Sequence, residues 1–255
     1  MHEVALNLPG RDEKIAAFLH FIRELGAAGI CYNTYGTTAT GIWSSPGTVE
    51  GRGGITARVY DQATAKGEWN GKVYGSADEL FHGREFTEEE LWENYEFFIR
   101  QVAPVAEEAG VFIGLHPDDP PGGMKLGGVP RTLFGTFAGF QRALTIADSP
   151  NIGVCLCLGC WLEAGAELMG ASAVEAIRYF GRDNPWGQNK LFKIHFRVRP
   201  EAARDFSLSL IPRRFWRAEC EQPDGQVVRA VAGGAARHRL RGHALGHASA
   251  ARGRV

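Results

Sequence analysis

The chain has 255 residues, of which 44% are hydrophobic and 22% charged, and its formal net charge is −1. This composition is that of an ordinary soluble globular protein, and it excludes a charge imbalance that would by itself recruit nucleic acid or an acidic membrane surface. No apolar run approaches the roughly 18 residues of a membrane span, and the N-terminus lacks the pattern of a signal peptide. We therefore predict a cytoplasmic protein with neither a nucleic-acid nor a membrane partner.

The first third of the chain predicts a helix, a strand and a long loop. Residues Asp12 to Leu25 carry apolar side chains at three- and four-residue spacing, with Asp12 as the N-cap. Residues 29–33 then predict a short strand. Residues 34–86 show no clear period and are rich in glycine, threonine and aromatics. We predict a long loop there, which could include short helices and lie over a pocket, or else form a structural excursion.

From residue 87 onward the pattern alternates between helix and strand. Residues 87–109 predict a helix with a capping box of Thr87 and Glu90 and a kink at Pro104. Further helices are predicted at 134–147 and 172–181, strands at 111–115, 152–157 and 190–196, and a loop that could contain a helical turn at 158–170. Alternation of this kind predicts an α/β fold with a mostly parallel sheet. About four strands are predicted, half of a closed (β/α)8 TIM barrel.

The last part of the chain differs in character. No acidic residue follows Asp224, and no clean periodicity survives beyond Val231. We predict a partial TIM-barrel catalytic domain at residues 1–199 and an atypical tail at 200–255, either disordered or read in a shifted frame. A nucleic-acid-binding arm is disfavoured because the basic tail lacks interleaved aromatic residues.

Three metal-binding residue types stand where predicted strands end. His116, Cys157 and His195 each close an apolar strand. Because the carboxyl ends of parallel strands share one face of a sheet, these side chains are expected to meet. Two imidazoles and a thiolate in one cleft predict a divalent metal site. Each histidine taken alone is more often structural than a ligand.

Neighbouring residues allow several roles. Asp118 and Asp119 could bind metal, orient a ligand, act as general acid and base, or stabilise a turn. The five cysteines are an odd number, which favours thiols or ligands over a disulfide framework. Cys155, Cys157 and Cys160 could form a zinc knuckle. We favour core packing for Cys155, although alternation places it on the same side of its strand as Cys157.

The segments around these residues resemble the mannonate dehydratase family. The matching segments are CYN at 31–33, PVAEEAGV at 104–111, HPDDPP at 116–121, GGVPR at 127–131, ADSPNIGVCLCLGCW at 147–161, EAIRYFG at 175–181 and KIHFR at 193–197. The resemblance implies a (β/α)8 barrel that holds Mn2+ or Fe2+ through His116, Cys157 and His195. It implies a hydro-lyase of hexuronate and glucuronate catabolism, which dehydrates D-mannonate to 2-dehydro-3-deoxy-D-gluconate and could form a homo-oligomer.

The resemblance also suggests where the substrate binds. Arg131 and Arg197 are candidates for its carboxylate, with Asn33 as a further contact, and Asp118 and Asp119 are candidates for proton transfer. The chain departs from the family pattern because earlier βα units and a closing Pro-Asp-His segment, which carries a fourth ligand, are missing. We therefore expect an incomplete barrel. A related sugar isomerase or epimerase and an inactive truncated fragment are the alternatives.

Overall fold

A four-stranded parallel sheet forms the centre of the protein. The computed structural model describes residues 1–36, 39, 41–50, 54, 56–69, 72–196, 218–221 and 227–230. The sheet has the order β1-β6-β9-β10, and all three strand pairs are parallel. Its strands are β1 (Tyr32–Tyr35), β6 (Phe112–Leu115), β9 (Ile152–Cys157) and β10 (Leu191–His195). This arrangement confirms the predicted α/β fold with a parallel sheet.

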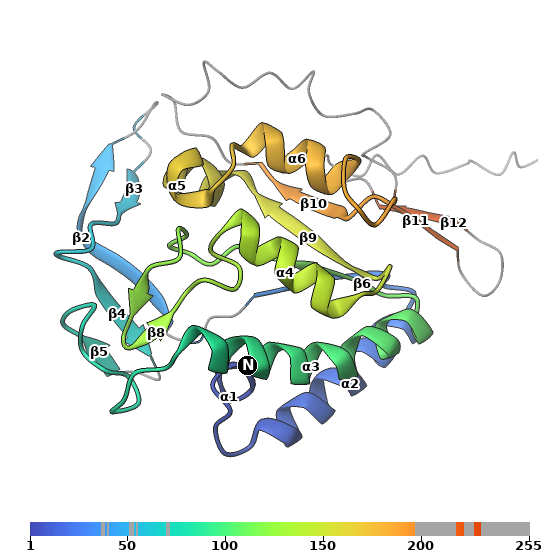
Figure 1. The fold of residues 1–255 in the computed structure, drawn as a ribbon, viewed down its shortest axis with the longest axis horizontal. Helices are drawn as coiled ribbons and strands as arrows, with labels where there is room; N and C mark the ends of the chain where they lie inside the picture. The colour runs from blue at the N-terminus through green and yellow to red at the C-terminus, as the bar shows by residue number, and fades with distance from the viewer. Residues whose placement is uncertain are drawn as a thin grey trace, which may run out of the picture.

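Helices connect the strands and cover one face of the sheet. They are α1 (His2–Ala5), α2 (Arg11–Ala27), α3 (Glu88–Glu108), α4 (Phe137–Ala147), α5 (Leu158–Met169) and α6 (Ala173–Gly181). Figure 1 shows α4 and α6 in front of the strands and α3 beside α4, and α3 packs against both α2 and α4. Among the described residues, none of these helices is long and apolar enough to cross a membrane.

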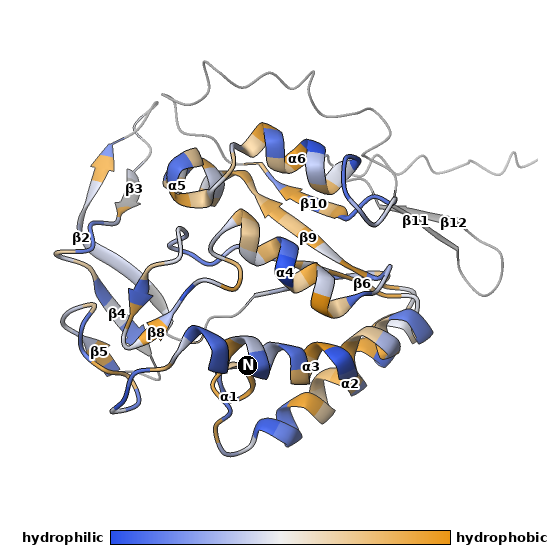
Figure 2. Ribbon diagram, in the orientation of Figure 1, coloured by the Kyte–Doolittle hydropathy of each residue, from blue (hydrophilic) through white to orange (hydrophobic). Residues whose placement is uncertain are grey.

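The core lies between this helical layer and the sheet. Alternate residues of the strands, such as Ile113, Leu115, Val154 and Leu156, are buried in one hydrophobic cluster with the apolar stripes of the helices. Figure 2 shows β9 hydrophobic along its length and α3 with alternating hydrophilic and hydrophobic patches. The intervening strand residues therefore point to the opposite face of the sheet.

Helix ends follow the predictions in most places. The capping boxes of α3 at Thr87 and of α6 at Ser172 are both present. The predicted cap at Asp12 is wrong, because α2 begins after Gly10 without a side-chain cap. The helix α3 continues through Pro104.

The prediction of a loop at 158–170 is also wrong. Residues Leu158–Met169 form α5, which is interrupted at Gly165, where φ is +72°. Leu158 and Trp161 are buried in the core. The burial of these side chains stabilises a helix here, although the glycines in this segment obscure the apolar periodicity that would have predicted it.

The prediction of a long loop over residues 34–86 is corrected by a second sheet. Its antiparallel order is β3-β2-β4-β5, with β2 (Ile42–Glu50), β3 (Thr56–Val59), β4 (Lys66–Trp69) and β5 (Lys72–Tyr74). Trp43, Tyr74 and Phe81 form the centre of a small separate core. These strands are stabilised by pairing and by this core, which single-sequence periodicity does not detect.

Two short hairpins complete the described structure. Strands β7 (Lys125–Leu126) and β8 (Val129–Pro130) pair within a predicted glycine- and proline-rich loop. Strands β11 (Ala218–Glu221) and β12 (Val227–Ala230) pair within the predicted tail. Residues 197–217, 222–226 and 231–255, which include Arg197, lie outside the described residues. The domain boundary at 199 therefore stays a prediction, as does the incompleteness of the barrel.

A buried lysine holds the end of the sheet opposite His195. The side chain of Lys190 is 1% exposed, and its Nζ donates hydrogen bonds to the carbonyl oxygens of Ser149 at 2.5 Å and Ile152 at 3.3 Å. Burial lowers the pKa of Lys190 to about 8, because the charged ammonium loses its hydration.

Lys190 gives the fold a pH-dependent stability. Above a pH of about 8 the folded state loses the Lys190 proton, whereas the unfolded chain keeps it up to about 10.4. The free energy of unfolding should therefore rise by roughly 1–2 kcal/mol between about pH 7.5 and 9.5, relative to Lys190→Met. Urea unfolding at both pH values measures this difference. Exposed Lys14→Met should behave as wild type, and an identical pH dependence in Lys190→Met would refute the assignment.

Candidate metal centre

The three residues predicted as ligands come together at one edge of the parallel sheet. His116 directly follows β6, and Cys157 and His195 are the last residues of β9 and β10. His195 pairs in register with Cys157. Their ligand atoms all lie within 4.8 Å of one another. Alternation along each strand places all three on the face opposite the hydrophobic core.

The ring of His116 is oriented by its own backbone. Its Nδ1 lies 2.7 Å from the carbonyl oxygen of Pro117. A carbonyl oxygen can only accept, so Nδ1 carries the hydrogen and Nε2 of the neutral ring keeps its lone pair. That Nε2 lies 3.1 Å from Nδ1 of His195. Such a backbone partner is what commonly fixes the tautomer of a metal-binding histidine.

His195 has a second partner, Cys155, for which the sequence predicted core packing. Its Nε2 lies 3.6 Å from Sγ of Cys155, which is completely buried, as core packing predicts, and also contacts the centre. A hydrogen on Nε2, directed at this sulfur, leaves Nδ1 of His195 facing His116 with a lone pair. The signal was present in the sequence, because alternation places Cys155 on the same face as Cys157.

The three groups shift one another's pKa. Burial opposes a charge on His116, but hydrogen bonds to Cys157 and to the Pro117 carbonyl outweigh it and raise the His116 pKa. A hydrogen bond from Cys160, with a further one from His116 when its ring is protonated, lowers the pKa of Cys157. Burial and the adjacent His116 lower the pKa of His195. These shifts favour the Cys157 thiolate, which is the form that binds metal.

The donor set fits a divalent transition-metal ion. Two imidazole nitrogens and one thiolate are ligands of Zn2+ and Fe2+ sites, and ligand atoms within 4.8 Å of one another surround a single candidate site. In the described part of the chain, Cys160 groups with Asp119 and Glu163 instead, again within 4.8 Å. Neither group combines Cys155, Cys157 and Cys160 as the zinc-knuckle alternative requires.

Sequence reasoning missed two residues on the same face of the sheet. The hydroxyl of Tyr32 lies 3.0 Å from Oγ1 of Thr34, both on β1. A Cβ at Gly114 would overlap the Tyr32 hydroxyl oxygen and stand 3.1 Å from Cβ of Cys155. Glycine at 114 therefore allows Tyr32 to lie across the sheet beside Cys155.

The carboxylates of the loop after β6 lie in different surroundings. Asp118 is buried and lines a small cavity of about 20 Å³ together with Arg131. Asp119 is exposed, and its charge contributes to the raised pKa of His116. The two adjacent residues therefore face different environments.

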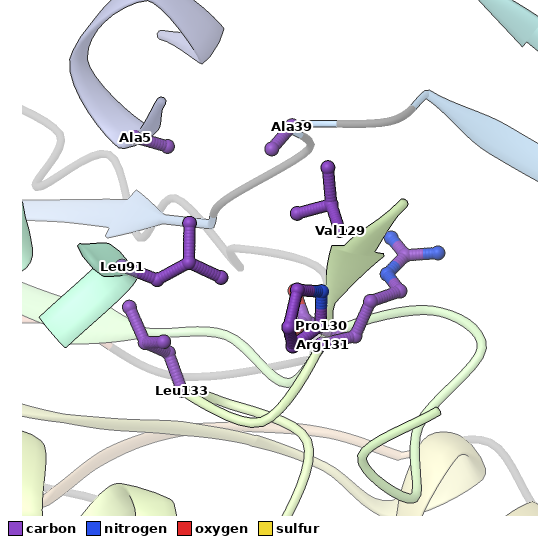
Figure 3. A pocket seen from close by; sticks show the side chains of 8 residues that line it. Ala5, Ala39, Leu91, Val129, Pro130, Arg131 and Leu133 are labelled. Carbon is purple, nitrogen blue, oxygen red and sulfur yellow. The ribbon is translucent and has the colours of Figure 1, made fainter. Parts of the chain in front are cut away.

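Arg131 is buried with a free donor. Its side chain is 4% exposed, and its Nη1 has no hydrogen-bond partner within the described ranges. Figure 3 shows Arg131 beside Val129 and Pro130 at the cavity. A buried guanidinium nitrogen without a partner is costly, so an anionic ligand would satisfy it.

Asn33 is not brought to the metal centre. It lies on β1 between Tyr32 and Thr34, so it points toward the helical side, where it lines a depression with Phe18 and Phe21 of α2. Arg197, the other predicted carboxylate contact, lies outside the described residues.

Comparison with known proteins identifies the family. A family model described as D-mannonate dehydratase (UxuA) matches residues 1–198. The chain belongs to this family. The mannonate dehydratase of Streptococcus pneumoniae (strain 70585) is 33% identical over 172 residues, which are 59% of this chain and 44% of that protein. The mannonate dehydratase of Shouchella clausii (strain KSM-K16) is 32% identical over 187 residues, 62% of this chain and 50% of that protein.

A solved structure supports the fold. The crystal structure of mannonate dehydratase from Streptococcus suis serotype2 matches with a TM-score of 0.57 and 24% identity, covering 76% of this chain and 51% of that one. The chain thus has a TIM-barrel-like α/β fold. The chain spans about half the length of the curated relatives it matches.

Proposed function

We propose that this chain carries the metal-dependent active site of a hydro-lyase that dehydrates D-mannonate to 2-dehydro-3-deoxy-D-gluconate. The observation that supports this proposal best is the convergence of His116, Cys157 and His195 on one point, at the sheet edge where α/β barrels place their chemistry. The family match and the relatives named mannonate dehydratase support the choice of substrate.

His116, Cys157 and His195 would hold the metal. We propose Fe2+ or Mn2+, and the thiolate favours Fe2+, because sulfur ligands suit softer ions than Mn2+. When bound, the ion supplies positive charge that stabilises the negative charge developing next to C2 of the substrate. Cys155 and the Pro117 carbonyl would keep the two rings in the tautomers that direct lone pairs at it.

Arg131 would bind the carboxylate of D-mannonate. Its guanidinium is already buried, and Nη1 lacks a partner among the residues that the structure describes. A carboxylate accepts two parallel hydrogen bonds from such a group, which would orient C1 and C2 of the sugar acid.

The two aspartates would handle the protons. Dehydration removes the hydrogen of C2 as a proton and the hydroxyl of C3 as water, which requires a base and an acid. Asp119 is exposed and near His116, so we propose that its carboxylate accepts the C2 proton. Asp118, which lines the cavity with Arg131, is the candidate that delivers a proton to the C3 hydroxyl.

Product analysis tests this function. Purified protein loaded anaerobically with Fe2+, or with Mn2+, should convert D-mannonate to a 2-keto-3-deoxy acid, and His195→Ala should abolish conversion. The matched control is His20→Ala, an exposed histidine on α2. A product that retains the elements of water would show that the activity is that of an isomerase or epimerase and not of a dehydratase. No turnover by the metal-loaded protein would contradict the proposal.

Metal binding can be measured without turnover. Saturating Mn2+ should raise the melting temperature, because a ligand at 100 times its dissociation constant stabilises the fold by about 2.7 kcal/mol. His116→Ala should lose most of this shift, because it removes one of three donors. His20→Ala should retain it in full. An equal shift in His116→Ala would place the metal elsewhere.

The proposed role of Arg131 in carboxylate binding predicts how its substitution changes kcat/KM. Arg131→Met should lower kcat/KM roughly 10- to 100-fold, from the loss of about 1.5–3 kcal/mol of charged hydrogen bonding, and Arg131→Lys should lie between. Arg142→Met, at an exposed arginine paired with Glu89, is the control. Circular dichroism checks that each variant folds. Unchanged kinetics in a folded Arg131→Met would exclude this residue from carboxylate binding.

A further inference from the structure

Cys157 has a second thiol as its neighbour. Cys157 is the N-cap residue of α5, and Cys160 lies in the first turn of that helix. The two side chains share a hydrogen bond. Both are nearly completely buried, with exposed fractions of 4% and 0%. One of the two sulfurs belongs to the candidate metal centre, and the other does not.

The spacing of these cysteines is suited to a disulfide. They form a C-x-x-C pair, Cys157-Leu158-Gly159-Cys160, between β9 and α5 of a strand–helix–strand unit. Residues three apart in a first helical turn have Cβ atoms about 5–6 Å apart, and disulfides need about 3.5–4.5 Å. A C-x-x-C pair beside a βαβ unit is the arrangement of reversible redox dithiols. Gly159 between them adds backbone freedom for the small movement required.

The other neighbours of Cys160 suit this chemistry. Its Sγ lies within 4.8 Å of carboxylate oxygens of Asp119 and Glu163, both of which are exposed. These carboxylates lie beside the Cys160 thiol and can relay its proton to the hydroxide that leaves. Cys155 faces His195 instead, so Cys160 is the cysteine placed to react with Cys157.

We propose that Cys157 and Cys160 form a reversible disulfide when the protein meets a hydroperoxide, and that this disulfide switches off metal binding. The Cys157 sulfur attacks the terminal peroxide oxygen, the O–O bond breaks, and an alcohol, or water from hydrogen peroxide, leaves. The Cys160 sulfur then attacks the resulting sulfenic sulfur, the S–OH bond breaks, and hydroxide leaves with the Cys160 proton as water. Two thiols are oxidised by two electrons, and the peroxide is reduced.

The disulfide would remove one of the three ligands of the candidate metal centre. A sulfur in a disulfide carries no negative charge and is no longer a thiolate ligand. Only His116 and His195 would then remain of the three donors. The disulfide itself depends only on the sulfur pair, whereas its effect on metal binding rests on the proposed function.

Peptide mapping and metal binding on the same sample test the inference. Metal-free protein treated with hydrogen peroxide should lose two of its five thiols and yield a peptide with a Cys157–Cys160 cross-link, two hydrogens lighter. Its Mn2+-induced melting shift should disappear and return after treatment with dithiothreitol. Cys160→Ser should form no cross-link, and its loss of metal binding should resist dithiothreitol, because Cys157 over-oxidises.

Cys31→Ser is the matched control. Cys31 lies at the opposite end of the sheet, just before β1, so this variant should behave as wild type. A cross-link between any other pair, or full Mn2+ binding by the cross-linked protein, would overturn the inference. Reduced protein that binds no Mn2+ would refute the proposed metal site and the switch, while the peptide map would still decide whether the disulfide forms.

Discussion

The centre depends on the register of parallel strands. Three strands of one sheet end at the same edge, and a side chain from each points to the same face because strand residues alternate. His195 is paired directly with Cys157, and His116 follows the neighbouring strand by one residue. A slip of one residue in β10 would turn His195 into the hydrophobic core. The tight helical packing on the other face is therefore what holds the three donors together.

The two faces of the sheet have different roles. One face is mostly apolar and packs against α3, α4 and α6, which supplies the burial that stabilises the fold. The other face carries Cys155, Tyr32 and Gly114 beneath the donors. The helical face thus sets the position of the backbone, and Cys155 on the second face contacts the ring of His195. At the far end of the strands, Lys190 donates hydrogen bonds to the carbonyl groups of Ser149 and Ile152, both of which are buried residues.

The segments around the centre bring two kinds of chemistry into contact. The loop after β6 contributes His116 and Asp119, and the start of α5 contributes Cys157 and Cys160. Each segment thus supplies one residue to each of two neighbouring groups. The sulfur of Cys157 stands between them, hydrogen-bonded to both His116 and Cys160. Metal binding and sulfur oxidation would compete for this one atom, since either use excludes the other.

The sequence by itself determined the order of the main helices and strands and the capping boxes at Thr87 and Ser172. It also identified His116, Cys157 and His195 as the candidate metal ligands. These features rest on local periodicity and on residue types at strand ends. Only the tertiary structure decided that residues 42–74 form a second sheet, that Cys155 contacts His195, and that Asn33 faces α2. It also decided that Arg131 is buried with a free donor. The reason is physical: pairing between distant strands and the burial of a single side chain depend on contacts far apart in the chain, which local spacing does not encode.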